Sequence, residues 1–116
     1  MKYLEKLQLS SNSLTGTLPS SLGNLIALKE VNVGGNTLTG SIPEELGNIP
    51  TLAVISLYEN DLNGSIPSNL GALESLKSLS VFDNNITGNV TEFCASGDLT
   101  VKVDCDKVEE CKCCSC

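Results

Sequence analysis

The chain repeats one pattern every 24 residues, and this period limits its possible folds more than any other feature. Four residue types return at this interval, in the columns Asn12, Asn36, Asn60 and Asn84; Leu4, Leu28, Leu52 and Leu76; Gly16, Gly40, Gly64 and Gly88; and Pro19, Pro43 and Pro67. One repeat is too short to bury its own apolar side chains, whereas stacked repeats share a continuous core. The chain is therefore expected to form a solenoid.

Each repeat contains a short segment with the two-residue alternation of a β-strand. In the first repeat Leu7 and Leu9 alternate with Lys6, Gln8 and Ser10, so the leucines are expected to point inward. Copies of this segment would lie side by side as parallel strands, about 4.8 Å apart. The repeated asparagine follows each strand and is expected to point inward, where its amide must be hydrogen-bonded. We therefore predict a ladder that bridges backbone groups of successive turns, formed by Asn12, Asn36, Asn60 and Asn84.

The full pattern reads L-x-x-L-x-L-x-x-N-x-L-x-G-x-I-P-x-x-L-G-x-L, with LTGSIP (residues 38–43) and LNGSIP (62–67) as distinctive parts. It resembles the leucine-rich repeat family over roughly residues 1–93. The closest likeness is to the plant-type subclass of receptor-like kinases, receptor-like proteins and polygalacturonase-inhibiting proteins. The resemblance implies an α/β solenoid, a right-handed superhelix made mostly of strands and irregular turns, with a parallel sheet on its concave face. Because members of this family bind ligands, it implies recognition, with no enzymatic activity and no cofactor.

The last repeat departs from the pattern, and two parts are predicted: about four leucine-rich turns over residues 1–93 and a cysteine-rich C-terminal cap over residues 94–116. If the period continues, Val103 lies beside Leu79 and Cys105 lies beside Val81. LTVKVDC (99–105) would then be the last strand of the solenoid. A cap is needed at this end because an open solenoid exposes a slice of its apolar core.

All the cysteines fall in this cap, at Cys94, Cys105, Cys111, Cys113, Cys114 and Cys116. We interpret them as a disulfide staple, because short secreted segments without their own core are commonly held in this way. The spacing C-x-C-C-x-C also resembles a thiolate cluster for zinc or copper. The pairs Cys111–Cys114 and Cys113–Cys116 fit a C-x-x-C redox motif only formally. Six cysteines allow 15 pairings, so the sequence leaves the connectivity open. A bond between the adjacent Cys113 and Cys114 would be strained, so each is expected to pair elsewhere.

The N-terminal end begins inside a repeat and in phase with it, because Met1 falls in the column of Leu25, Ile49 and Leu73. We expect an N-terminal cap to be missing, and further repeats or domains to precede this segment in a longer protein. The alternative is a natural short protein with a frayed first turn.

Composition excludes several classes of function. The net charge is −7 and there is no histidine and no arginine, so a nucleic-acid-binding surface is not expected. Without histidine the sequence offers no Ser-His or Cys-His pair, and we predict no catalytic residue and no metal site. The longest apolar runs fall far short of a membrane span, and no signal peptide is visible. The cysteines, with the sequons at Asn63, Asn85 and Asn89 as possible N-glycosylation sites, favour an extracellular or cell-surface location.

A ligand would be expected on the outward side of the strands. Reading the sequence in steps of 24 residues brings Tyr58 and Phe82 together on neighbouring strands, and aromatic side chains are common interface anchors. The predicted recognition patch comprises Tyr58, Phe82, Val54, Glu59, Asp61 and Asp83. The alternative is that the two rings serve only strand pairing.

We therefore expect a non-catalytic module that recognises a protein, peptide or carbohydrate ligand as part of a receptor-like or secreted protein. Two alternatives stay open: a structural solenoid end without a ligand of its own, and a thiolate metal-binding tail on an inert solenoid.

Overall fold

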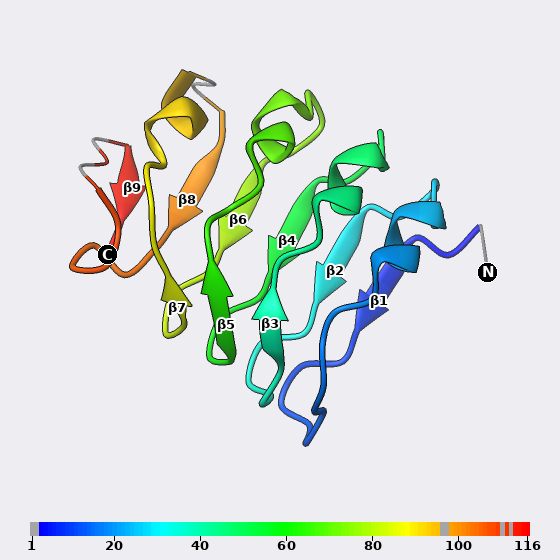
Figure 1. Cartoon of the computed structure of the whole chain (residues 1–116). Helices are drawn as coiled ribbons and strands as arrows, with labels where there is room; N and C mark the ends of the chain where they lie inside the picture. The colour runs from blue at the N-terminus through cyan, green and yellow to red at the C-terminus, as the bar shows by residue number, and fades with distance from the viewer. Residues whose placement is uncertain (1–2, 96–97, 110, 112) are drawn as a thin grey trace.

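A computed structural model of the chain describes residues 3–95, 98–109, 111 and 113–116. Successive turns lie side by side along one axis, as the colour sequence in Figure 1 shows. A typical turn contains a strand, a second short strand on the opposite side of the stack, and a 3₁₀ helix. The predicted solenoid is thus confirmed.

The first strands of the turns form a six-stranded parallel sheet in the order β1-β2-β4-β6-β8-β9 (Figure 1). Their bounds are β1 Lys6–Gln8, β2 Glu30–Asn32, β4 Val54–Ser56, β6 Ser78–Ser80, β8 Thr100–Lys102 and β9 Cys114–Ser115. The middle residues of β2, β4, β6 and β8 are fully buried, and their flanking residues point outward in most of the strands, as the alternation predicts. We call the outward side of this sheet the concave face.

The second strands form a three-stranded parallel sheet in the order β3-β5-β7, with bounds β3 Thr39–Ser41, β5 Asp61–Gly64 and β7 Asn85–Ile86. Short 3₁₀ helices complete the turns: η1 Ser20–Asn24, η2 Glu44–Asn48, η3 Ser68–Ala72 and η4 Thr91–Ala95. The glycine that recurs in every repeat has a physical reason here, since Gly16, Gly40, Gly64 and Gly88 all adopt positive φ between 80° and 98°. A side chain is disfavoured in that conformation, which explains why glycine returns at this position.

The core between the two sheets is a continuous stack of aliphatic side chains. Leu28, Leu52, Ile55 and Leu79 are among its fully buried members. The aromatic member is Phe93, at 1% exposure, which packs against Gly71 of the preceding turn. The chain therefore builds its core by stacking small layers, as a solenoid must.

The register of the last turn corrects the sequence prediction. Leu79 in β6 pairs with Val101 in β8, not with Val103, because the last turn is two residues shorter than the others. A shift of two residues leaves inward and outward positions unchanged, so Val101 and Val103 are both buried. Cys105, however, was expected beside Val81 and inside; it lies beyond the strand and is exposed.

The sheet also ends later than predicted. LTVKVDC does not supply its last strand: β9, formed by Cys114 and Ser115 of the cysteine-rich tail, pairs in parallel with β8. The boundary predicted between residues 93 and 94 falls inside η4, so that division of the chain stays a prediction. None of the described helices has the length and apolar character that a membrane span requires.

Candidate functional site

The concave face is held in place by the repeated asparagine. The Asn60 side-chain nitrogen donates to the carbonyl of Leu57 in its own turn, at 3.2 Å, and to that of Val33 in the preceding turn, at 3.0 Å. Its side-chain oxygen accepts a bond from the backbone N–H of Leu38 at 3.0 Å. Asn36 and Asn84 make the equivalent bonds, and all three asparagines are buried. Each one therefore fastens its strand to the turn before it.

Asn12, at the N-terminal end of the ladder, differs from the other three. It is exposed, and among the residues that the structure describes its side chain donates only to carbonyls of its own turn, those of Leu9 and Ser10, at 3.0 and 3.1 Å.

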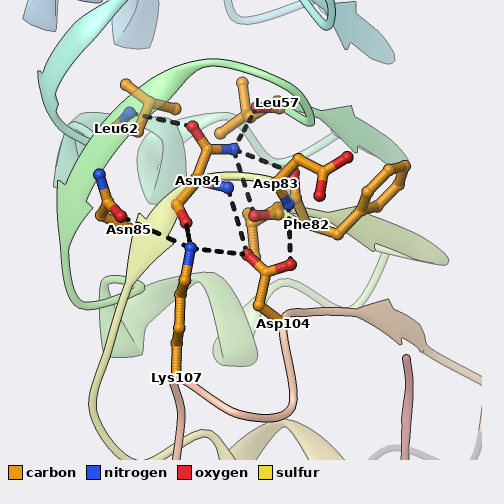
Figure 2. A network of polar contacts seen from close by, with 9 residues as sticks. Leu57, Leu62, Phe82, Asp83, Asn84, Asn85, Asp104 and Lys107 are labelled. Atoms are coloured by element: carbon orange, nitrogen blue, oxygen red, sulfur yellow. Dashed lines mark hydrogen bonds and ion pairs between the residues drawn. The ribbon is translucent and has the colours of Figure 1, made fainter.

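The C-terminal end of the ladder is closed by two residues that the sequence analysis missed, Asp104 and Lys107 (Figure 2). The Asp104 carboxylate accepts bonds from the backbone N–H groups of Asp83 and Asn84, at 2.9 and 3.2 Å. The Lys107 ammonium group donates to the Asn84 carbonyl at 2.6 Å and lies 4.0 Å from the Asp104 carboxylate. Only the shortened last turn brings these residues here, so the 24-residue period could not have indicated them.

Two aromatic side chains lie together on the concave face. The rings of Tyr58 and Phe82 are stacked, with centroids 5.3 Å apart and an interplanar angle of 15°. Tyr58 also covers Gly34: a Cβ atom added to that glycine would lie 2.2 Å from the Tyr58 ring. Glycine at position 34 thus leaves the space that the tyrosine ring occupies.

The other residues of the predicted patch are not all brought together. Val54 lies in β4 on the concave face, and Glu59 and Asp83 follow the ends of two strands at its rim. Both acidic residues are exposed and adopt positive φ, 52° and 55°, because the chain turns sharply there. Asp61 begins β5 and so belongs to the second sheet, away from the two rings.

The cysteine-rich tail is joined by three disulfides, which confirms the predicted disulfide-stapled cap. The pairs are Cys94 with Cys113, Cys105 with Cys116 and Cys111 with Cys114, at Cα–Cα distances of 5.4, 5.7 and 5.6 Å. Cys113 and Cys114 each pair elsewhere, as expected. The sulfurs of Cys94, Cys111 and Cys113 lie within 4.8 Å of one another, but they are in disulfides, and it is the thiolate that binds metal.

The three sequons share one side of the molecule. Asn63 lies in β5 and Asn85 in β7, while Asn89 follows three residues after β7, and all three are exposed. Exposure is a condition for glycosylation, and their occupancy stays a prediction.

Stacked parallel strands, a buried asparagine ladder and a second sheet with a recurring glycine define a leucine-rich repeat solenoid. Residues 2–62 match the family model described as "Leucine rich repeat", and the chain belongs to this family, in its plant-type form. No curated protein sequence matches the chain.

Similar solved structures include plant proteins of three kinds. A TDR receptor is 36% identical with a TM-score of 0.83, over 90% of this chain and 18% of that one. The BIR3–SERK2 complex from Arabidopsis thaliana contains a chain that is 31% identical with a TM-score of 0.80, over 97% of this chain and 60% of that one. A plant ice-binding protein is 30% identical with a TM-score of 0.80, over 89% of this chain and 34% of that one. The chain thus spans less than two thirds of each.

Proposed function

We propose that this chain is part of an extracellular recognition protein and that its concave face binds a protein or peptide ligand. The similarity to a TDR receptor and to a chain of the BIR3–SERK2 complex supports recognition as the general role. Three disulfides in 116 residues support an oxidising compartment. The proposal includes no catalytic step.

The observation that carries the proposal is the stacked pair of Tyr58 and Phe82. Both rings are partly exposed on the concave face, and neither belongs to the hydrophobic core. Aromatic side chains that are held rigidly and remain accessible are the usual anchors of protein interfaces. The acidic rim formed by Glu59 and Asp83 favours a ligand with basic groups beside its apolar anchor.

The size of the face limits the affinity. Six strands about 4.8 Å apart, each presenting five residues about 3.3 Å apart, give roughly 500 Å². A standard interface buries about 800 Å² on each partner. The chain covers 18% of the TDR receptor structure, and we expect its own contribution to binding to be weak.

The proposal is tested by selecting random peptides displayed on phage against the immobilised, oxidised chain. Selected peptides should lose about tenfold or more in affinity for the double variant Tyr58→Ala/Phe82→Ala. The matched control is Thr39→Ala/Asn63→Ala, which alters two exposed residues of the second sheet and should leave binding unchanged. Circular dichroism of all variants checks that the solenoid is folded.

Peptides that bind the concave-face double variant as well as they bind the original chain would contradict the proposal. So would a selection that yields no binding peptide, which would favour a structural solenoid end without a ligand of its own.

A second candidate function, ice binding, is favoured by the second sheet. Its outward side carries a grid of exposed side chains that are almost all uncharged and hydrogen-bonding, in register across the strands: Thr17, Thr39 and Asp61; and Ser41, Asn63 and Asn85. Parallel strands about 4.8 Å apart repeat such groups at a regular spacing, which suits a periodic ligand. One similar structure is that of a plant ice-binding protein.

Ice binding is tested by measuring ice recrystallisation with protein made without glycans, because glycans at the three sequons would cover the grid. Inhibition that is lost in Thr39→Lys/Asn63→Lys and kept in Tyr58→Ala/Phe82→Ala would support this function. Recrystallisation at the rate of a serum albumin control would exclude it.

A further inference from the structure

The concave face has a hollow of about 270 Å³ at its C-terminal end. The residues that line it come from three neighbouring turns: Phe82 after β6, Lys102 at the end of β8, and Ser115 and Cys116 in and after β9. This volume is below the ~300–1,000 Å³ of pockets that hold drug-sized molecules. The hollow is therefore of a size for one side chain.

The row of residues that leads to this hollow explains its shape. Gly34, Tyr58 and Phe82 occupy equivalent positions in successive turns, and the tyrosine ring lies over the glycine while the phenylalanine ring stacks on the tyrosine. Phe82 thus has Tyr58 on one side, and on the side of the next turn it lines the hollow.

The next residue of the row leaves that side of Phe82 uncovered. The register of β6 and β8 makes Asp104 the neighbour of Phe82, and no third aromatic residue follows. The Asp104 carboxylate turns instead to the backbone N–H groups of Asp83 and Asn84, where it closes the asparagine ladder (Figure 2). The hollow therefore lies where a third aromatic ring, stacked on Phe82, would continue the row.

The cysteine-rich tail supplies the far wall. Cys116 is bonded to Cys105, which follows β8, and the Val103 backbone N–H donates to the Ser115 carbonyl at 3.0 Å. These two links fix Ser115 and Cys116 beside Phe82. The wall is thus built by the same disulfide that closes the solenoid.

The charge at the hollow differs from that of the neighbouring rim. Lys102 is exposed and forms no ion pair with any residue that the structure describes. Glu59 and Asp83, at the rim beside the two rings, are acidic. An unpaired ammonium group beside an open aromatic face favours a ligand that carries a ring and a carboxylate close together.

We propose that this hollow binds an aromatic side chain of a peptide or protein ligand, with a neighbouring carboxylate on Lys102. The ring completes the row formed by Tyr58 and Phe82 and gains an offset-stacked contact with Phe82. This inference rests on the concave-face function proposed above, and it identifies the anchor of the ligand.

The probe that tests the inference is 3-phenylpropionate, which carries one ring and one carboxylate. Titrated into the ¹⁵N-labelled, oxidised chain, it should shift the backbone amides of Lys102 and Ser115, with a dissociation constant in the millimolar range that is usual for so small a ligand. Two analogues separate the contributions: 3-cyclohexylpropionate keeps the charge without the planar ring, and 3-phenylpropanol keeps the ring without the charge. Each should bind about threefold or more weakly.

Variants locate the site. Phe82→Leu keeps an apolar side chain and should weaken the probe by about fivefold, and Lys102→Gln should weaken the probe but leave 3-phenylpropanol unchanged. Lys29→Gln is the matched control, since Lys29 pairs with Glu5 in an earlier turn, and it should have no effect. An unchanged amide spectrum outside the hollow shows that each variant is folded.

Several results would overturn the inference: no shift at Lys102 and Ser115, equal binding of the cyclohexyl analogue, or a probe that binds Lys102→Gln as well as the original chain. None of these would affect the proposed function if concave-face-dependent peptides are still selected. Conversely, if the probe binds in the hollow but no peptide is selected, the aromatic-binding hollow is supported and the proposed function is contradicted.

Discussion

The third turn and the last turn solve the same two problems with different residues. Each must satisfy the backbone groups at the end of a strand and cover the apolar layer beside it. The third turn does so with Asn60, whose side-chain bonds reach its own turn and the turn before it. The last turn uses Asp104, Lys107 and three disulfides, and β9 is the edge strand of the sheet in the part of the chain that the structure describes. Interior turns can thus all use the same repeated residues, whereas an end of the solenoid requires residues that the repeat does not contain.

Within the described residues, the first turn has neither a preceding turn for its asparagine to bond nor a cap made of disulfides. Leu9 occupies the position of Leu57 but is 39% exposed, against 0% for Leu57. Asn12 likewise bonds only within its own turn. Burial in this molecule therefore depends on having a neighbour, and identical positions in different turns serve as matched pairs for experiment.

The largest effect is expected from Leu57→Ala. Leu57 is fully buried between the sheets, and the cavity left by truncation should lower the free energy of unfolding by about 2–5 kcal/mol. Leu9→Ala, at the equivalent position of the first turn, should cost clearly less. Denaturant unfolding of both variants measures the difference, and equal losses would contradict a burial that depends on neighbouring turns.

The disulfide Cys105–Cys116 is expected to matter next. The bond joins residues separated by 11 positions, and for a loop of this length the chain-entropy model gives a stabilisation of about 3 kcal/mol. In Cys105→Ala/Cys116→Ala the Val103 amide should lose its protection from hydrogen exchange, because its acceptor lies on β9. The amides of β2 and β4 should keep theirs. If the Val103 amide stays protected, the tail is held by contacts other than this bond.

Removal of a ladder residue is expected to have a smaller effect. Asn60→Ala leaves buried backbone groups of two turns without partners, which should cost about 1–3 kcal/mol. Asn12→Ala removes bonds that are exposed and confined to one turn, so its unfolding midpoint should be nearly unchanged. Similar midpoints for the two variants would show that the buried bonds between turns add no stability.

The smallest effect is expected from Asp104→Ala. It removes the acceptor for the backbone N–H groups of Asp83 and Asn84 after β6, in bonds that are exposed or only partly buried. Water can replace the carboxylate there in part, so the loss should be about 1 kcal/mol. Asp106→Ala removes an exposed acidic residue two positions further along and serves as the control for net charge. Thermal unfolding that gives the two variants the same midpoint would show that Asp104 does not stabilise the end of the ladder.

Much of the fold followed from the sequence because the repeat fixes both its local structure and its neighbours. The alternation at Val31 and Val33 predicts an inward-facing strand, and the fixed interval predicts which residue lies beside each one. The proximity of Tyr58 and Phe82 was predictable for the same reason. Asp61 was less predictable, because the chain enters the second sheet at the residue directly after the ladder residue Asn60.

The sequence by itself determined the period, the direction of each side chain in the regular turns, and a staple made of cysteines. Only the tertiary structure decided the two-residue shortening of the last turn, the pairing of the six cysteines, and the positions of Asp104 and Lys107. The physical reason is the range of the contacts. Within the repeats each residue meets its partner at a fixed distance along the chain, whereas partners in the tail depend on where the chain folds back. The tail could fold back in several ways that are all compatible with its local sequence. Only packing against the last turn selects one of these conformations.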